Sequence, residues 1–361
     1  MRASYSRVWC FSLLILGCGS PVNTQATDTE RQVITLNEAA ARFDRIGMLD
    51  SAWIAADSAI RLSEGVLGPD HPVTALSLNG LAALMYNWGR IEKAESLYTR
   101  IFTIWEQHPP IDSTLFGAAL YNYGTIQLEK RRPGDAVSTL ARAAVVLEAT
   151  LGSRDQHVGD AYYTQGEAYR ALKNCESALP AYRRSLEIRN TLEGPANLSV
   201  AQTLNSIGVC LVALDSLQEA ERVYQRALTI VEQVNGPDDV ASAYCMDNLA
   251  RLYLRQKRYT EAERLSSLAL DVFRVTPGEG SPEVAQSLVL RGEIFLGSGQ
   301  YDRAVESLRE AEALLMSLAG PSHRAVLDVR KSLSEAMALA VDSSRAAEAG
   351  GEPDSAAPDS E

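Results

Sequence analysis

The sequence predicts an all-α protein, a solenoid of seven helix pairs that ends in a C-terminal capping helix. Two observations predict this class. A pattern of small and large residues returns every 42 positions without an insertion. Inside each copy the apolar residues recur at helical spacing, and no alternating strand pattern is present. An uninterrupted repeat of this length indicates one array of stacked units, which we place at residues 32–340.

The overall composition is that of an ordinary globular chain. Of its 361 residues 46% are hydrophobic and 22% charged, and the formal net charge is −12. A protein that grips the nucleic-acid backbone needs a basic surface, so this balance argues against a nucleic-acid partner.

Residues 1–17 have the layout of an export signal. Arg2 and Arg7 supply a positive start, and the apolar run 8–17 is too short to span a bilayer as a helix. An ordinary secretory signal with this layout would give a secreted soluble protein.

The end of this run resembles the lipobox of a bacterial lipoprotein signal. Ile15 stands three residues before Cys18 and a glycine directly before it, although Leu16 is bulkier than the family usually has. The resemblance implies that the chain is exported, cut before Cys18 and anchored to a membrane through lipid on that cysteine. Gly19 is not the aspartate that retains such lipoproteins at the inner membrane of enteric bacteria. The periplasmic face of the outer membrane is therefore favoured, if the cell has one.

Two segments flank the array. Residues 18–31 are polar and without periodicity, which predicts a flexible tether. Residues 341–361 are acidic and end in a stretch rich in Gly, Pro and Ser, which predicts a disordered tail.

The repeat is defined by small residues. Seven alanines lie 42 residues apart and mark the second helix of each pair: Ala52, Ala94, Ala136, Ala178, Ala220, Ala262 and Ala304. Twelve residues before each of these anchor alanines stands another small residue, on the first helix: Ala40, Ala82, Gly124, Gly166, Gly208, Ala250 and Gly292. Two helices that cross closely need small side chains where their axes approach, so these positions are predicted to be packing contacts.

Loops and turns follow the same period. Sixteen residues after the anchors come Gly68, Pro110, Gly152, Gly194, Gly236, Gly278 and Gly320, which predicts the end of each second helix. A short break such as 214–216 separates the two helices of a pair. The capping helix is expected near 323–340, with a polar outer face that includes Arg330, Lys331 and Glu335.

The order of residues in each copy resembles the tetratricopeptide repeat. In the fifth copy a small residue, a large one, an alanine and an aromatic residue stand at Gly208, Leu211, Ala220 and Tyr224. The period of 42 and the phrase LGPDHP at 67–72 are similar to the extended repeats of kinesin light chains. This resemblance implies a right-handed superhelix whose first helices line a concave surface.

Residues for catalysis or cofactor binding are not evident. His71, His157 and His323 lie in the loops, where the resemblance implies that they help to cap the next helix. No spacing typical of a metal site or a phosphate loop is present, and the internal cysteines are predicted to be core residues. We therefore expect no enzyme activity, no metal and no cofactor.

The sequence favours a protein that binds other proteins. The resemblance implies that asparagines on the concave face hold the backbone of a bound peptide, and aromatic residues there can add contact area. The candidate partner-binding residues are Asn79, Tyr86, Asn122, Tyr163, Arg170, Asn205, Asn248 and Arg251. The leading hypothesis is a membrane-tethered, non-catalytic scaffold that binds a peptide segment of a partner. The alternative is a regulatory sensor that binds a small molecule or a signalling peptide.

Overall fold

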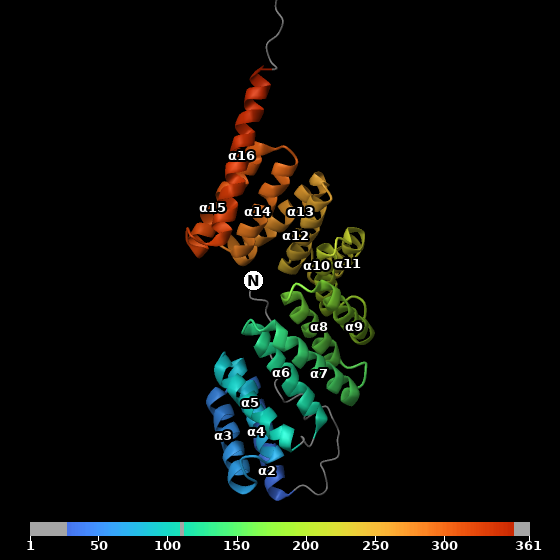
Figure 1. The fold of residues 1–361 in the computed structure, drawn as a ribbon, viewed down its shortest axis with the longest axis vertical. Coiled ribbons are helices and arrows are strands. Elements are labelled where there is room, and N and C mark those ends of the chain that lie inside the picture. The colour runs from blue at the N-terminus through green and yellow to red at the C-terminus, as the bar shows by residue number, and fades with distance from the viewer. Residues whose placement is uncertain (1–26, 109–111, 350–361) are drawn as a thin grey trace, which may run out of the picture. The chain divides into compact units, whose positions relative to one another are not determined.

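The computed structural model describes residues 27–108 and 112–349, and within them there are fifteen α-helices and no β-strand (Figure 1). The predicted all-α class, with seven pairs and a final helix, is confirmed. The pairs of the first half are α2 (Asp28–Arg45) with α3 (Leu49–Val66), α4 (Pro72–Asn87) with α5 (Ile91–Gln107), α6 (Ser113–Glu129) with α7 (Pro133–Leu151), and α8 (Gln156–Ala171) with α9 (Cys175–Glu193). The second half holds α10 (Leu198–Ala213) with α11 (Leu217–Asn235), α12 (Val240–Arg255) with α13 (Tyr259–Phe273), the π-helical turn η1 (Arg274–Gly278), α14 (Pro282–Gly297) with α15 (Tyr301–Ala319), and α16 (Arg324–Ala349).

The chain divides into two compact units between Gly194 and Pro195. We call α2 to α9 unit 1 and α10 to α16 unit 2. Within each unit the two helices of a pair pack against each other, and each pair also contacts the next one along the chain.

Small residues form the contact inside each pair, as the repeat predicts. All seven anchor alanines have an exposed fraction of 0%. A glycine twelve positions earlier faces a large side chain of the second helix: a Cβ added at Gly166 would lie 2.6 Å from the ring of Tyr182. The close approach of the two helices therefore excludes a larger side chain at these positions.

The turn between the two helices of a pair has the same backbone in every copy. The residue five positions before the anchor has a positive φ, between 57° and 78°, in all seven pairs: Gly47, Gly89, Arg131, Lys173, Asp215, Lys257 and Gly299. The next residue returns a hydrogen bond to the first helix, as from the Ser216 amide to the Leu211 carbonyl oxygen at 2.9 Å. This left-handed residue reverses the chain within three residues.

The loops after the second helices also follow the prediction. Each described glycine at this position has a positive φ, while Pro110 lies outside the described residues. His71 and His323 cap the next helix, since each Nδ1 accepts a hydrogen bond from a backbone amide, at 3.2 and 3.3 Å. The same prediction for His157 is wrong, because Asp155 caps α8 and the His157 ring pairs with that carboxylate at 2.8 Å.

Both ends of the array differ from the expected limits. Helix α2 begins at Asp28 rather than 32, because Thr27 and Glu30 form a capping box there. Helix α16 runs to Ala349 rather than 340, since the alanine-rich segment 341–349 has no glycine or proline to end it. The expected signal at 1–17 and the rest of the tether and tail lie outside the described residues.

The last helix, α16, ends unit 2, and its exposed face carries both polar and apolar side chains. Val326, Val329, Leu333 and Ala336 are buried. The predicted polar residues Arg330, Lys331 and Glu335 are exposed, and the exposed side chains also include Leu327, Met337 and Val341.

Candidate binding groove

The first helices of unit 2 lie next to one another. Helix α12 contacts both α10 and α14. The amide nitrogen Nδ2 of Asn248 on α12 donates to Oδ1 of Asn205 on α10 at 2.8 Å. Two turns further along, Nη1 of Arg255 donates to the carbonyl oxygen of Val212 at 2.6 Å. These contacts fix the register of α12 on α10 and leave one face of the three helices open.

That open face holds a cavity of about 370 Å³, which we call the unit 2 cavity. It is lined by side chains of α10, α11, α12 and α14: Val209, Val212, Tyr224, Asn248, Arg251, Leu252, Leu254, Arg255, Leu290 and Glu293. Leu252, Leu290 and Tyr224 are buried and form apolar parts of its wall. The cavity therefore combines an apolar interior with four polar side chains.

Most charges around the cavity are paired. Nε of Arg251 donates to Asp247 at 2.9 Å, and Nη2 of Arg255 donates to Asp215 at 3.0 Å. Glu293 has neither a hydrogen bond nor an ion pair with any residue in the described part of the chain. Burial raises the pKa of the Glu293 carboxyl, which the charge of Arg251 partly offsets. Burial also raises the pKa of Asp247.

Three of the predicted partner-binding residues come together here. Asn248 and Arg251 line the cavity, and Asn205 holds Asn248 in place. All three side chains are half-buried. They lie on the face of the first helices that the sequence predicted for binding.

The same prediction is wrong about the accessibility of Asn79 and Asn122 in unit 1. Their exposed fractions are 0% and 1%, and none of their amide atoms has a hydrogen-bond partner among the described residues. They occupy the repeat positions of Asn205 and Asn248, which face each other across adjacent first helices. Tyr121 and Thr164 meet in this register too, at 3.4 Å between their hydroxyl oxygens. Side chains at these two repeat positions therefore point at the neighbouring first helix. In unit 1 the helices cover Asn79 and Asn122.

The other predicted residues of unit 1 are engaged within the protein. The hydroxyl of Tyr86 donates to Glu129 at 2.5 Å. Arg170 forms two hydrogen bonds with the buried Glu167. The ring of Tyr163 lies under the guanidinium of Arg189, 4.7 Å from its centroid. Their side chains remain partly exposed.

Sequence reasoning missed part of the cavity lining. Arg255, Leu290 and Tyr224 follow the helical period too, but nothing in one sequence separates them from core or surface positions. Glu293 and Val209 stand eleven residues before their anchors, the position that Arg251 also occupies. Their shared repeat position with Arg251 could have identified Glu293 and Val209 as candidate binding residues.

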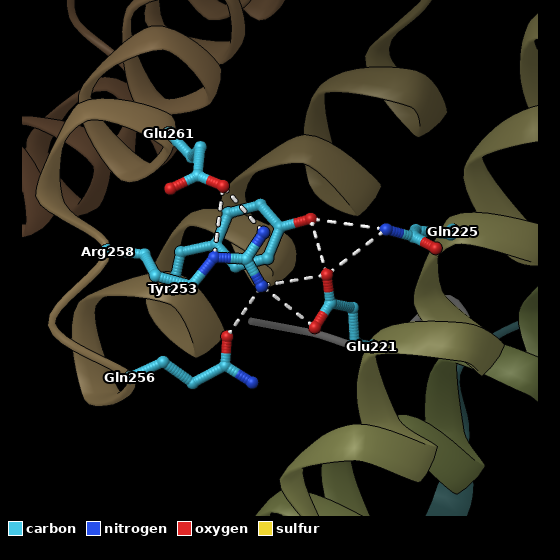
Figure 2. Close-up of polar contacts among 6 residues, drawn as sticks. All are labelled: Glu221, Gln225, Tyr253, Gln256, Arg258 and Glu261. Atoms are coloured by element: carbon cyan, nitrogen blue, oxygen red, sulfur yellow. Dashed lines mark hydrogen bonds and ion pairs between the residues drawn. The ribbon is translucent and has the colours of Figure 1, made fainter.

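A polar cluster joins the first two pairs of unit 2 (Figure 2). Nη1 of Arg258, at the start of α13, donates to both carboxylate oxygens of Glu221 on α11 at 2.9 Å, and Nη2 donates to Glu261 at 2.6 Å. Its guanidinium lies 4.1 Å from the ring centroid of Tyr253, whose hydroxyl donates to Glu221 and accepts from Gln225. The hydrogen bonds to Glu261 and Glu221 raise the pKa of Arg258 above the ordinary value of an arginine.

This cluster is one step of a repeated ion-pair pattern. Arg132 binds Glu95 with the same separation of 37 residues. A second series joins consecutive second helices, 36 residues apart, in the pairs Glu64–Arg100, Glu148–Arg184 and Arg274–Glu310. Because the pairs recur with the repeat, we assign them to stacking and not to a site.

Other chemistry is not supported by the described residues. They contain no group of three or more His, Cys, Asp or Glu that could hold a metal ion. Cys175, Cys210 and Cys245 are buried and form no disulfide bond, and burial raises the pKa of the Cys245 thiol to about 12, so it is not a reactive thiolate. None of the helices in residues 27–108 and 112–349 is long and apolar enough to cross a membrane.

Comparison with known proteins agrees with the repeat fold. The family model described as tetratricopeptide repeat matches residues 31–107, 115–191, 199–266 and 245–317. Curated protein sequences give no significant match.

Three solved structures resemble the chain. The apo form of RapI is 14% identical with a TM-score of 0.62, over 84% of this chain and 86% of RapI. The STAND protein PH0952 from Pyrococcus horikoshii, which has a tetratricopeptide repeat sensor, is 14% identical with a TM-score of 0.59, over 90% of this chain and 48% of that protein. The kinesin-light-chain repeats of Podospora anserina are 17% identical with a TM-score of 0.50, over 58% of this chain and 99% of theirs. At these identities the likeness shows the fold.

Proposed function

Since the chain belongs to the tetratricopeptide repeat family, we propose that it is a non-catalytic scaffold that binds a peptide segment of a partner protein in the unit 2 cavity. The observation that carries this proposal is an open cavity on the first helices, bordered by predicted binding residues. Its volume of about 370 Å³ lies near the lower end of the ~300–1,000 Å³ typical of ligand pockets. It suits one or two side chains of an extended segment.

The lining supports a peptide ligand. Leu252, Leu290 and Tyr224 offer an apolar surface to a side chain. Asn248 is held by Asn205, so its amide is oriented before a ligand arrives and can pair with a peptide backbone. Fixing the group in advance reduces the entropy that binding costs.

The proposal includes attachment to a membrane through Cys18. Residues 19–27 could extend over at most about 30 Å, which would keep the first helix pair near the bilayer. The lipobox-like residues Ile15 to Cys18 support it. A Cys18→Ser variant should move from the membrane fraction to the soluble fraction, and wild-type protein found in the soluble fraction would contradict the anchor.

A regulatory sensor is the second candidate. The observation that favours it is the likeness to PH0952, whose repeats are named as a sensor. Native mass spectrometry of the protein isolated from membranes separates the two: a bound small molecule supports the sensor, and a stoichiometric protein supports the scaffold.

The binding site is tested by filling the cavity. Val209→Trp places an indole among the lining residues, and Val234→Trp makes the same change at an exposed site on α11. A peptide selected on the full chain from a random 12-residue library should lose at least tenfold in affinity for Val209→Trp, about 1.4 kcal/mol. It should bind Val234→Trp as it binds the wild type. Equal affinity for all three proteins would move the site elsewhere.

A further inference from the structure

The charges of the unit 2 cavity do not cancel. Arg255 forms an ion pair with Asp215, and Arg251 forms one with Asp247. Glu293 remains, a carboxylate with no ion-pair partner in the described residues. The three charged lining residues and the two carboxylates that pair with the arginines therefore sum to one negative charge.

Glu293 borders the cavity at a position that solvent can reach. It lies on α14 beside apolar lining residues, and its side chain is exposed. Burial raises the pKa of its carboxyl, the charge of Arg251 offsets this in part, and the charge of Asp247 adds to the rise. A carboxylate without an ion-pair partner can accept a charge-assisted hydrogen bond from an incoming cation.

The neighbouring side chains define the rest of the ligand. Val209, Leu254 and Leu290 line the same cavity and present apolar surface to it. A ligand that fills the cavity therefore needs a large apolar side chain as well as a positive group within reach of Glu293.

We propose that the unit 2 cavity selects a peptide segment in which a large apolar side chain stands next to a lysine or arginine, with Glu293 as the acceptor for the cation. This inference rests on the proposed function, because it names the chemistry of the segment that the cavity binds. The apolar side chain enters the cavity, and the basic side chain pairs with Glu293 at the rim.

The test uses three families of 12-residue peptides on the full chain. Each has a Gly/Ser background with one leucine, and the residue beside it, on either side, is Lys, Gln or Glu. The wild type should bind the best Lys peptide at least fivefold tighter than its Gln counterpart, about 1 kcal/mol, and the Glu peptide most weakly.

Variants assign the preference to one residue. Glu293→Gln should abolish the preference for Lys while the affinity for the Gln peptide stays the same. Glu306→Gln on α15 removes the same charge from another exposed side chain that does not line the cavity, so it controls for the acidic surface as a whole. Glu293→Lys should reverse the preference in favour of the Glu peptide.

The outcomes separate this inference from the proposed function. Peptides that bind the wild type without charge preference, or a preference that Glu293→Gln leaves intact, would overturn the inference alone. Peptide binding that survives Val209→Trp would overturn the cavity as the site. Failure of every peptide to bind the wild type would overturn both.

Discussion

Gly208 and Tyr224 meet where α10 crosses α11, and a Cβ added to Gly208 would lie 2.4 Å from Cε1 of the tyrosine ring. In most pairs, the size of the residue on the first helix depends on the size of the residue that it faces on the second helix. Glycine faces Leu or Tyr in four pairs, whereas Ala40 and Ala250 have the small residues Ala56 and Ser266 at the corresponding place. Ala82 with Tyr98 is the exception. No pair has two large side chains at the crossing, and a large residue there stands opposite glycine or, once, opposite alanine.

We predict that Gly208→Ala destabilises unit 2. The overlap with Tyr224 should cost about 1–3 kcal/mol, partly offset by the better helix propensity of alanine, about 1 kcal/mol. Gly65 in α3 is the control, since a Cβ there meets nothing within 4 Å. Gly65→Ala should leave the free energy of unfolding unchanged or raise it. If urea titrations gave the same change in the free energy of unfolding for both variants, the explanation that glycine is required by packing would be wrong.

The turn between paired helices gives a second prediction. Lys257 has a φ of 60° and Gly299 one of 78°, at the same repeat position. A left-handed backbone costs a residue with a Cβ roughly 1 kcal/mol, whereas glycine adopts it freely. Lys257→Gly should therefore raise the melting temperature or leave it unchanged, and Gly299→Ala should lower it by several degrees. Thermal unfolding that ranks the two in the opposite order would contradict this.

The fold was predictable from the repeat, because the close crossing of two helices requires a small residue at the same position of every 42-residue copy. Helix pairs, turns and closing glycines all follow from that phase. The binding face was harder to predict, because the period gives the direction of a side chain but not what covers it. Asn79 and Asn248 have nearly the same phase, yet one is buried and the other lines a cavity. Glu293 was not among the predicted binding residues, since its lack of an ion-pair partner depends on neighbours from other helices.

The two asparagine pairs should respond differently to substitution. Asn79 and Asn122 are buried without partners, so changing both to Ala removes unsatisfied polar groups and should leave peptide affinity unchanged. Changing Asn205 and Asn248 to Ala removes their 2.8 Å hydrogen bond and an amide of the cavity, which should weaken peptide binding about tenfold. Fluorescence anisotropy and thermal unfolding report the two effects separately. Equal loss of affinity in both double variants would contradict the assignment.

Glu293 should make stability depend on pH. Because its pKa is raised in the native state, the native state binds a proton more tightly than the unfolded chain does. The charged form therefore lowers the free energy of unfolding at neutral pH, and this loss is recovered as the pH falls through the raised pKa. Glu293→Gln should raise the melting temperature at pH 7 and reduce the gain on acidification, while Glu306→Gln should do neither. A lower melting temperature for Glu293→Gln at pH 7 would show that its charge stabilises the fold.

Hydrogen–deuterium exchange of the full chain, with and without a saturating selected peptide, tests most directly whether the partner binds to the first helices of unit 2. Slower exchange should appear at 205–214, 247–255 and 289–296, the segments of α10, α12 and α14 that border the cavity. The second helices α13 and α15, which contribute no side chain to the cavity, should change little, and α11 should change only around Tyr224. Protection confined to the second helices, or to the loops between pairs, would contradict the account.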